Sequence, residues 1–232
     1  MKKRICVGWV AGVVVVCLGC QAPAQAASPW GRLQPGQFDV GLRLATFSDS
    51  ARVEPEASPS KTGRGVEIAI WYPASSGDGH ERLQFADYVR HLPQFRQEVS
   101  QEALRKWLAI GISGKAGALE RRTLEQILAA PMHAIRDAAP AAEKFPLVLW
   151  TMRHDTLVAQ SVLGEFLASH GYVVAAARYA GPDLPRPWAI KTAEDKLATF
   201  ATHLQDLELA LTSLEKEPYV DAARVAIFTW SY

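Results

Sequence analysis

Ser231 stands in a setting that suits nucleophilic catalysis. It follows the apolar run Val225-Ala226-Ile227-Phe228 and the pair Thr229-Trp230. A short apolar, β-branched-rich run is typical of a parallel strand buried on both faces. A sharp turn after such a strand holds a serine hydroxyl above the sheet, as in the pattern G-x-S-x-G. Thr229 takes the place of the first glycine, and the second would be residue 233. We therefore predict that Ser231 is a nucleophile, with a plain surface serine after a strand as the alternative.

A serine nucleophile needs a base and an acid behind that base. In the strand–turn arrangement of G-x-S-x-G both follow the serine in the chain. The histidines all precede Ser231, at positions 80, 91, 133, 154, 170 and 203. We therefore expect the acid and the histidine beyond residue 232, and expect the chain as printed to be an inactive fragment. His154 with Asp155 is the one pair expected near the pocket, with an exposed loop pair as the alternative. Structural roles are expected for His170, Asp183 and Asp206.

Composition limits the partners and cofactors. The chain has 232 residues, 49% of them hydrophobic, and a net charge of +1. This balance gives no reason to expect a nucleic-acid partner. The cysteines are Cys6, Cys17 and Cys20, so the remaining chain has no disulfide, thiolate zinc site or cysteine nucleophile. No pair of histidines has metal-ligand spacing with a carboxylate nearby, so we expect no metal and no other cofactor.

The first 26 residues have the order of a secretory signal peptide. Residues 1–4 are basic, and residues 5–19 are apolar but short for a membrane span. Ala24-Gln25-Ala26 then offers an A-x-A cleavage site. We expect a mature domain of residues 27–232, secreted or periplasmic, without a membrane span. Lipid attachment at Cys20 is the alternative.

Hydrophobic periodicity predicts an α/β fold. A half-buried edge strand is expected at 40–47 and a second strand at 66–72, closed by Pro73. Residues 85–139 are expected to form a helical insertion between the second and third strands, with one apolar face over 99–108 and another over 124–128. Strands and helices then alternate: strand 146–150, helix 156–170 ended by Gly171, strand 172–177, helix 192–216 with a capping box at Thr192 and Asp195, and strand 225–228. This rhythm predicts a mostly parallel sheet with flanking helices.

Three stretches carry a family resemblance. They are Trp71-Tyr72-Pro73-Ala74, then Phe145 to Trp150 with Leu167 to Ala175, and Val220 to Ala226 leading to the serine. In this order and spacing the chain resembles an α/β-hydrolase of the platelet-activating-factor acetylhydrolase and dienelactone-hydrolase-like group. The likeness runs from about Phe38 to Tyr232, apart from the insertion.

The resemblance implies roles for particular residues. Ser231 would be the nucleophile, and the backbone N–H of Tyr232 one donor of the oxyanion hole. The second donor would come from Met152 or Arg153. Members of the family usually carry glycines here, whereas residues 151–156 have none, which restricts the backbone and the approach of substrate.

These observations support two hypotheses about function. The first is a secreted serine hydrolase that cleaves a small-molecule carboxylic ester, with a peptide bond as the alternative substrate. The second is a catalytically inactive α/β-hydrolase-fold protein that binds a ligand or partner, and the glycine-free loop at 151–156 motivates it.

Overall fold

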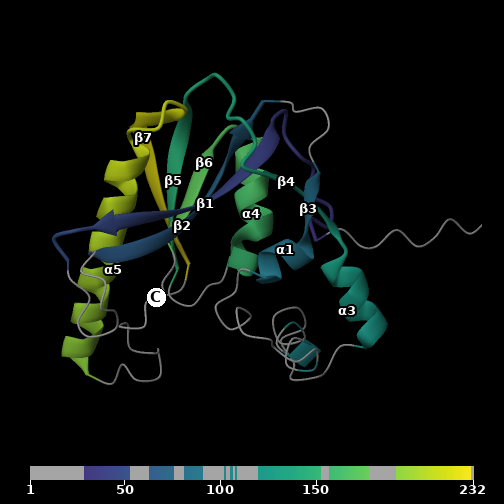
Figure 1. Cartoon of the computed structure of the whole chain (residues 1–232), viewed down its shortest axis with the longest axis horizontal. Coiled ribbons are helices and arrows are strands. Elements are labelled where there is room, and N and C mark those ends of the chain that lie inside the picture. Colours follow the sequence, from purple (N-terminus) through teal and green to yellow (C-terminus); the bar gives the residue numbers. More distant parts are fainter. Residues whose placement is uncertain are drawn as a thin grey trace, which may run out of the picture.

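A computed structural model of the chain describes residues 29–52, 63–75, 81–90, 102, 105, 106, 108, 120–152, 157–177 and 192–230 (Figure 1). Its strands are β1 (Asp39–Asp49), β2 (Arg64–Ala74), β3 (Arg82–Gln84), β4 (Pro131–Arg136), β5 (Phe145–Met152), β6 (Val173–Ala177) and β7 (Val220–Trp230). Its helices are α1 (Phe85–Arg90), α3 (Arg121–Leu128), α4 (Leu157–Ser169) and α5 (Ala193–Leu214).

The described strands form one sheet in the order β3-β4-β1-β2-β6-β5-β7. β6 pairs in parallel with β5, β5 with β7, and β4 with β1. β2 runs antiparallel to both of its neighbours, and β3 runs antiparallel to β4. All strands except β2 and β3 therefore point the same way. The predicted α/β class with a mostly parallel sheet is confirmed.

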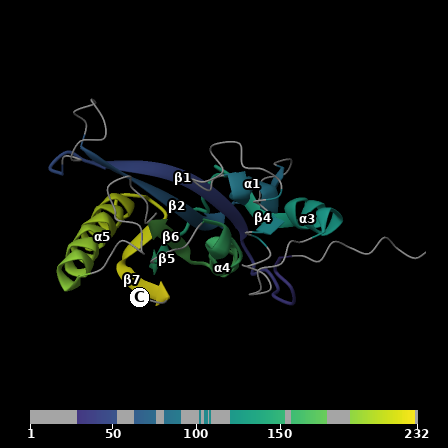
Figure 2. The same ribbon diagram turned by 90° about the horizontal axis from the view of Figure 1, so that it is seen from below.

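Two helical crossovers place one helix on each face of the sheet (Figure 2). The chain passes from β5 through α4 to β6, and returns through α5 to β7 on the other side of β5. Because both crossovers are expected to be right-handed, they must cover opposite faces. α4 packs against a core that contains Trp71, Trp150 and Val174. α5 packs against a second core that contains Leu147 and Leu149.

The helix ends predicted from sequence are confirmed. Thr192 accepts a hydrogen bond from the backbone N–H of Asp195, and the Asp195 side chain accepts one from the N–H of Thr192, which completes the capping box. At the end of α4, Gly171 has φ +91°. The N–H groups of Gly171 and Tyr172 donate to the carbonyls of Ala168 and Leu167, which is the Schellman arrangement.

The first strand is not the edge strand that we predicted. β4 pairs with residues 40–42 of β1, so the first part of β1 is an interior strand. Val40 and Leu42 are accordingly 1% and 0% exposed. The alternation expected of an edge strand begins only after residue 42, where β4 no longer pairs with β1.

The insertion at 85–139 is not wholly helical as we predicted. It contains α1 and α3, but residues 131–136 form β4. Met132 and Ala134 alternate toward the core and are 1% and 0% exposed, which is the period of a strand. Of the apolar face predicted over 99–108, the structure describes only Leu108 among the large apolar residues, and this side chain is buried.

β7 also differs from the prediction of a strand buried on both faces. It lies at the edge of the described sheet and pairs only with β5. Val225, Ile227 and Phe228 are 39%, 66% and 36% exposed.

A glycine in α4 allows that helix to approach the sheet. A Cβ added to Gly164 would lie 2.6 Å from the ring of Trp71, which is fully buried. We expect Gly164→Ala to lower the free energy of unfolding by about 1–3 kcal/mol through overpacking, although alanine is otherwise the better helix former. Urea unfolding measures this change. Gly65→Ala is the matched control, because its Cβ would meet only an ordinary contact at 3.5 Å. An equal effect of the two substitutions would contradict the packing explanation.

Candidate active site

The candidate site lies at the carboxyl ends of β5 and β7. In this parallel pair Trp150 lies opposite Phe228, Thr151 opposite Thr229, and Met152 opposite Trp230. The two strands thus end side by side (Figure 1). In α/β sheets ligands bind at the carboxyl ends of the strands.

Most of the predicted site residues fall outside the described residues. Ser231 and Tyr232 follow directly after Trp230, and Arg153 follows Met152. Met152 is described as the last residue of β5. The His154–Asp155 pair and Asp183 also lie outside the described part of the chain.

Local contacts fix the register that brings these ends together. The ring centroids of Trp150 and Phe228 are 5.0 Å apart in an edge-to-face contact, two residues before the last described pair. At the opposite end of β7, Asp221 accepts from the Ala223 N–H at 3.0 Å and from Arg224 Nε at 2.5 Å. The hydrogen bond from Arg224 lowers the pKa of Asp221. This small turn coincides with the register shift at Pro146/Leu147, after which β7 pairs regularly with β5.

The histidines that the structure describes have structural surroundings. The His170 ring lies 2.8 Å, at Nδ1, from the carbonyl oxygen of Phe166 at the end of α4, as predicted for a helix C-terminus. His133 lies against the Trp30 ring, with centroids 4.1 Å apart. His203 is 3% exposed within α5. Burial lowers the pKa of both His133 and His203, which favours their neutral forms.

A buried carboxylate in α4 was missed in the sequence. Glu165 is 0% exposed and accepts four hydrogen bonds. Its donors are Trp30 Nε1 at 2.9 Å, the Tyr88 hydroxyl at 2.5 Å, and the backbone N–H groups of His133 at 2.9 Å and Ala134 at 3.1 Å. The only signal in the sequence was a charged residue between Val162 and Phe166 on the inward face of the helix. Burial raises the pKa of Glu165, and the hydrogen bonds from its four donors oppose that shift.

Asp206 forms a second buried network, which supports its predicted structural role. Arg64 donates to Asp206 through Nε and a terminal nitrogen, both at 2.9 Å, and Arg52 donates at 2.7 Å. The Asp206 side chain is 1% exposed. Arg52 also pairs with Asp49 at 2.6 Å. The network connects the end of the β1–β2 pair at Asp49 and Arg64 to α5, the helix that precedes β7 in the chain.

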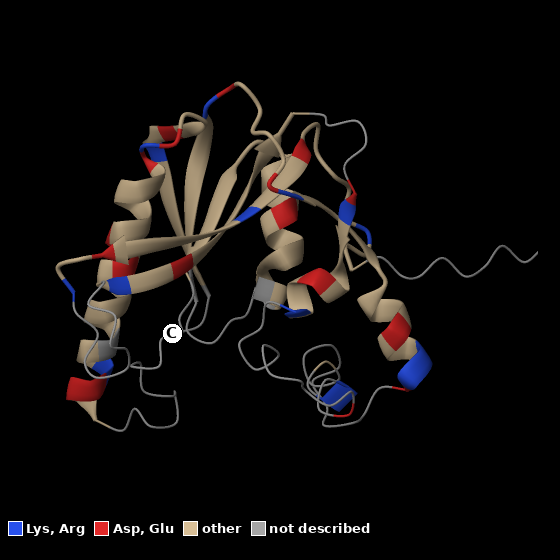
Figure 3. Cartoon of the chain, viewed as in Figure 1, with Lys and Arg blue, Asp and Glu red and all other residues tan. Residues whose placement is uncertain are grey.

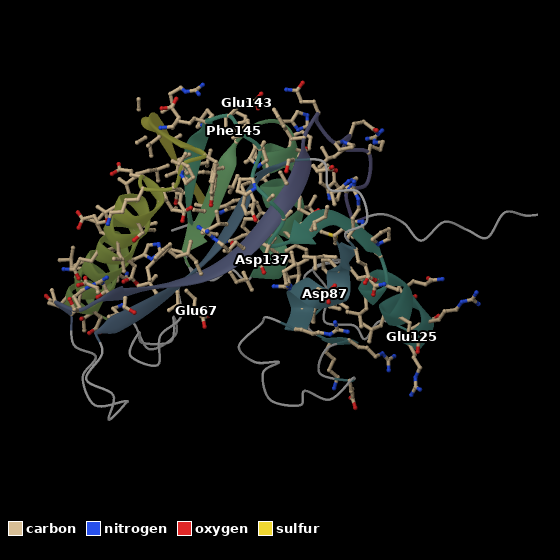
Figure 4. All side chains as sticks on the ribbon, turned by 45° about the horizontal axis from the view of Figure 1, so that its top comes forward. Glu67, Asp87, Glu125, Asp137, Glu143 and Phe145 are labelled. Carbon is tan, nitrogen blue, oxygen red and sulfur yellow. The ribbon has the colours of Figure 1, made fainter. Side chains whose placement is uncertain are left out.

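The charged side chains of the described residues do not mark a further centre near the strand ends. Lys, Arg, Asp and Glu are interspersed over the described elements (Figure 3). Among the labelled residues of Figure 4, Phe145 is the first residue of β5 and Glu143 lies just before that strand, while Asp87 and Glu125 lie on α1 and α3. The described residues contain no group of three or more metal-ligating side chains. No helix in the described part of the chain is long and apolar enough to cross a membrane.

Comparison with known proteins identifies the fold. No family model matches the chain, and no curated protein matches it. Among solved structures, a ferulic acid esterase from Streptomyces cinnamoneus matches with a TM-score of 0.55 and 23% sequence identity. The match covers 85% of this chain and 54% of that chain, so this chain spans about half of the esterase's length.

This chain has an α/β fold similar to that of the matched structure. At 23% identity the likeness shows the fold alone. The narrower resemblance to platelet-activating-factor acetylhydrolases and dienelactone hydrolases stays a prediction, as do the roles of Ser231, Tyr232, Met152 and Arg153.

Proposed function

We propose that the protein is an exported serine hydrolase that cleaves a carboxylic ester of modest size, with Ser231 as its nucleophile. The observation that carries this proposal is the pairing of Met152 with Trp230. It brings the backbone that continues into Arg153 next to the backbone that continues into Ser231. A nucleophile and oxyanion-hole donors need this proximity. The solved structure of similar fold is named as a ferulic acid esterase, which agrees with an ester as substrate.

The chemistry proceeds in two balanced steps. The Ser231 hydroxyl oxygen adds to the ester carbonyl carbon while a base takes its proton, and the backbone N–H groups of Tyr232 and of Met152 or Arg153 bind the resulting oxyanion. The alcohol leaves with that proton, and an acyl group remains on the serine. Water then attacks the acyl-enzyme and releases the carboxylic acid. In this proposal the histidine and the acid come from polypeptide beyond residue 232, and residues 1–26 direct export.

Covalent labelling tests the nucleophile. The product of the complete reading frame is expected to react with a fluorophosphonate probe at Ser231 and to hydrolyse an activated ester. Ser231→Ala should abolish both, because no other residue would form the acyl-enzyme. Ser48→Ala, at an exposed position on β1, is the matched control and should change neither.

The second candidate is a catalytically inactive binding protein of the same fold, favoured by the lack of glycine in residues 151–156. A properly folded product without labelling or turnover would replace the first proposal with this one.

A further inference from the structure

The segment that precedes β1 lies against α4 and is mostly exposed. Among residues 29–38, Trp30 is the one buried residue, at 3% exposure, whereas residues 31–35 are exposed. Gly31 has φ +58°, and the N–H of Leu33 donates to the Trp30 carbonyl, so the chain turns directly after the tryptophan. A segment with little buried surface belongs to the least stable part of a fold. The Trp30 indole is therefore the principal anchor of this segment.

The indole occupies a site that other elements form. Its Nε1 donates to Glu165 Oε2 at 2.9 Å. Its ring centroid lies 4.1 Å from that of His133 and 6.0 Å from that of Phe166. These three residues belong to α4 and β4. An acceptor beside two aromatic rings suits an indole, which has a single N–H donor on an apolar ring.

This site is held together without the indole. Glu165 Oε1 accepts from the Tyr88 hydroxyl at 2.5 Å and from the Ala134 N–H at 3.1 Å. Oε2 also accepts from the His133 N–H at 2.9 Å. These three donors belong to α1 and β4, so they still hold the carboxylate when the bond from Trp30 is broken. A site organised in advance binds its ligand at a low cost in ordering.

Backbone contacts at the end of α4 hold the other end of the segment. The Gly36 N–H donates to the Ser169 hydroxyl at 2.9 Å, and the Phe38 N–H donates to the Ser169 carbonyl at 3.1 Å. A Cβ added to Gly36 would lie 2.1 Å from that carbonyl oxygen, so the close approach requires glycine. These contacts lead directly into β1. They keep the segment beside its site when the indole leaves.

We propose that Glu165, His133 and Phe166 form an indole-binding site, which Trp30 fills as an internal ligand on a detachable strap of residues 30–35. The strap leaves and re-enters the site while the sheet stays folded. With the Trp30 side chain removed, the same site binds free indole through a hydrogen bond from the indole N–H to Glu165. The proposal does not depend on Ser231 being a nucleophile.

Trypsin cleavage after Arg32 under native conditions measures release of the strap, because the bond to Leu33 lies within the turn. In the product of the complete reading frame, the new N-terminus at residue 33 is followed at increasing urea concentrations. We expect the cleavage rate to rise far less steeply with urea than global unfolding does, because the slope reports the surface that opening exposes. An equally steep dependence would show that the strap leaves only on global unfolding, and would overturn the proposal.

Trp30→Gly is expected to raise the cleavage rate at least about 100-fold, because it removes the buried indole. Added indole should restore protection in a saturable manner, whereas 1-methylindole, which has no N–H to donate, should not. Trp30→Phe keeps an aromatic ring without the N–H and should raise the rate about 10-fold. Leu33→Ala, at a 44% exposed position of the strap, is the matched control and should change the rate by no more than about twofold.

Unchanged cleavage of both Trp30 variants would show that the indole does not hold the strap. Equal protection of Trp30→Gly by indole and 1-methylindole, or protection by neither, would show that Glu165 does not select an N–H donor, and would overturn the assignment of the site. If Trp30→Gly does not fold, the urea dependence of the wild type and the rate for Trp30→Phe decide in its place.

Discussion

Replacing Glu165 with leucine is expected to lower the free energy of unfolding by about 3–5 kcal/mol, because it leaves several buried donors without an acceptor. The Trp30 ring N–H, the Tyr88 hydroxyl and two backbone N–H groups of β4 all donate to this carboxylate. Leucine has a similar volume, so the loss reports hydrogen bonding rather than a cavity. Urea unfolding with tryptophan fluorescence measures it.

Glu208→Leu on the exposed face of α5 is the matched control and should change the free energy of unfolding by no more than about 0.5 kcal/mol. A loss at Glu165 no larger than at Glu208 would show that the four hydrogen bonds contribute nothing net.

The raised pKa of Glu165 adds a pH signature to this prediction. The folded protein holds a proton on Glu165 at pH values where the unfolded chain has already released it. Stability from this group is therefore fully present below the unfolded pKa and is lost as pH rises through the higher folded pKa. Unfolding free energies measured across that window should fall more with pH for the wild type than for Glu165→Gln. Equal slopes for the two proteins would contradict the shift.

The sequence was most informative where periodicity and local chemistry act together. Strands β5 and β6 and helices α4 and α5 follow from apolar period and from end signals such as Thr192 and Gly171, because capping depends on neighbours within a few residues. The role of Ser231 at the end of β7 stays a prediction, because residues 231–232 lie outside the described residues.

The failures have a different physical origin. The sequence predicts helix over β4 because Met132 and Ala134 offer too few positions to distinguish a period of two from one of 3.6. The strand is formed by pairing with β1, whose residues lie about ninety positions earlier in the sequence. Because β4 pairs with β1, β1 is an interior strand and not the predicted edge strand. Glu165 and Arg64 could not be paired with their partners from sequence, because a buried polar group is recognisable only once tertiary structure supplies its donors and acceptors.

Removing the charge of Asp206 is expected to lower the free energy of unfolding by about 3–5 kcal/mol, because it breaks a buried, doubly hydrogen-bonded ion pair with Arg64. In Asp206→Asn, Arg64 would lose a bidentate carboxylate while its side chain stays only 9% exposed. Arg52 would keep its hydrogen bond to Asp49, so the substitution should weaken the interactions of Arg52 less than those of Arg64. Chemical denaturation measures the change. Glu102→Gln in the exposed Lys106–Glu102 pair is the control, with an expected effect below about 1 kcal/mol.

A double variant distinguishes an unpaired charge from general disruption of α5. Asp206→Leu alone removes the carboxylate that faces the buried Arg64 guanidinium, whereas Asp206→Leu with Arg64→Met removes both charges and replaces them with apolar groups. Replacing a buried ion pair in this way is often neutral or stabilising, so the double variant should be more stable than Asp206→Leu alone. Since α5 leads directly into β7, a network that holds α5 also supports the strand that ends beside the candidate nucleophile. Arg64→Met alone completes the comparison. If the effects of Asp206→Leu and Arg64→Met simply add in the double variant, Arg64 and Asp206 are not energetically coupled, and the ion pair does not stabilise the packing of the β1–β2 pair against α5.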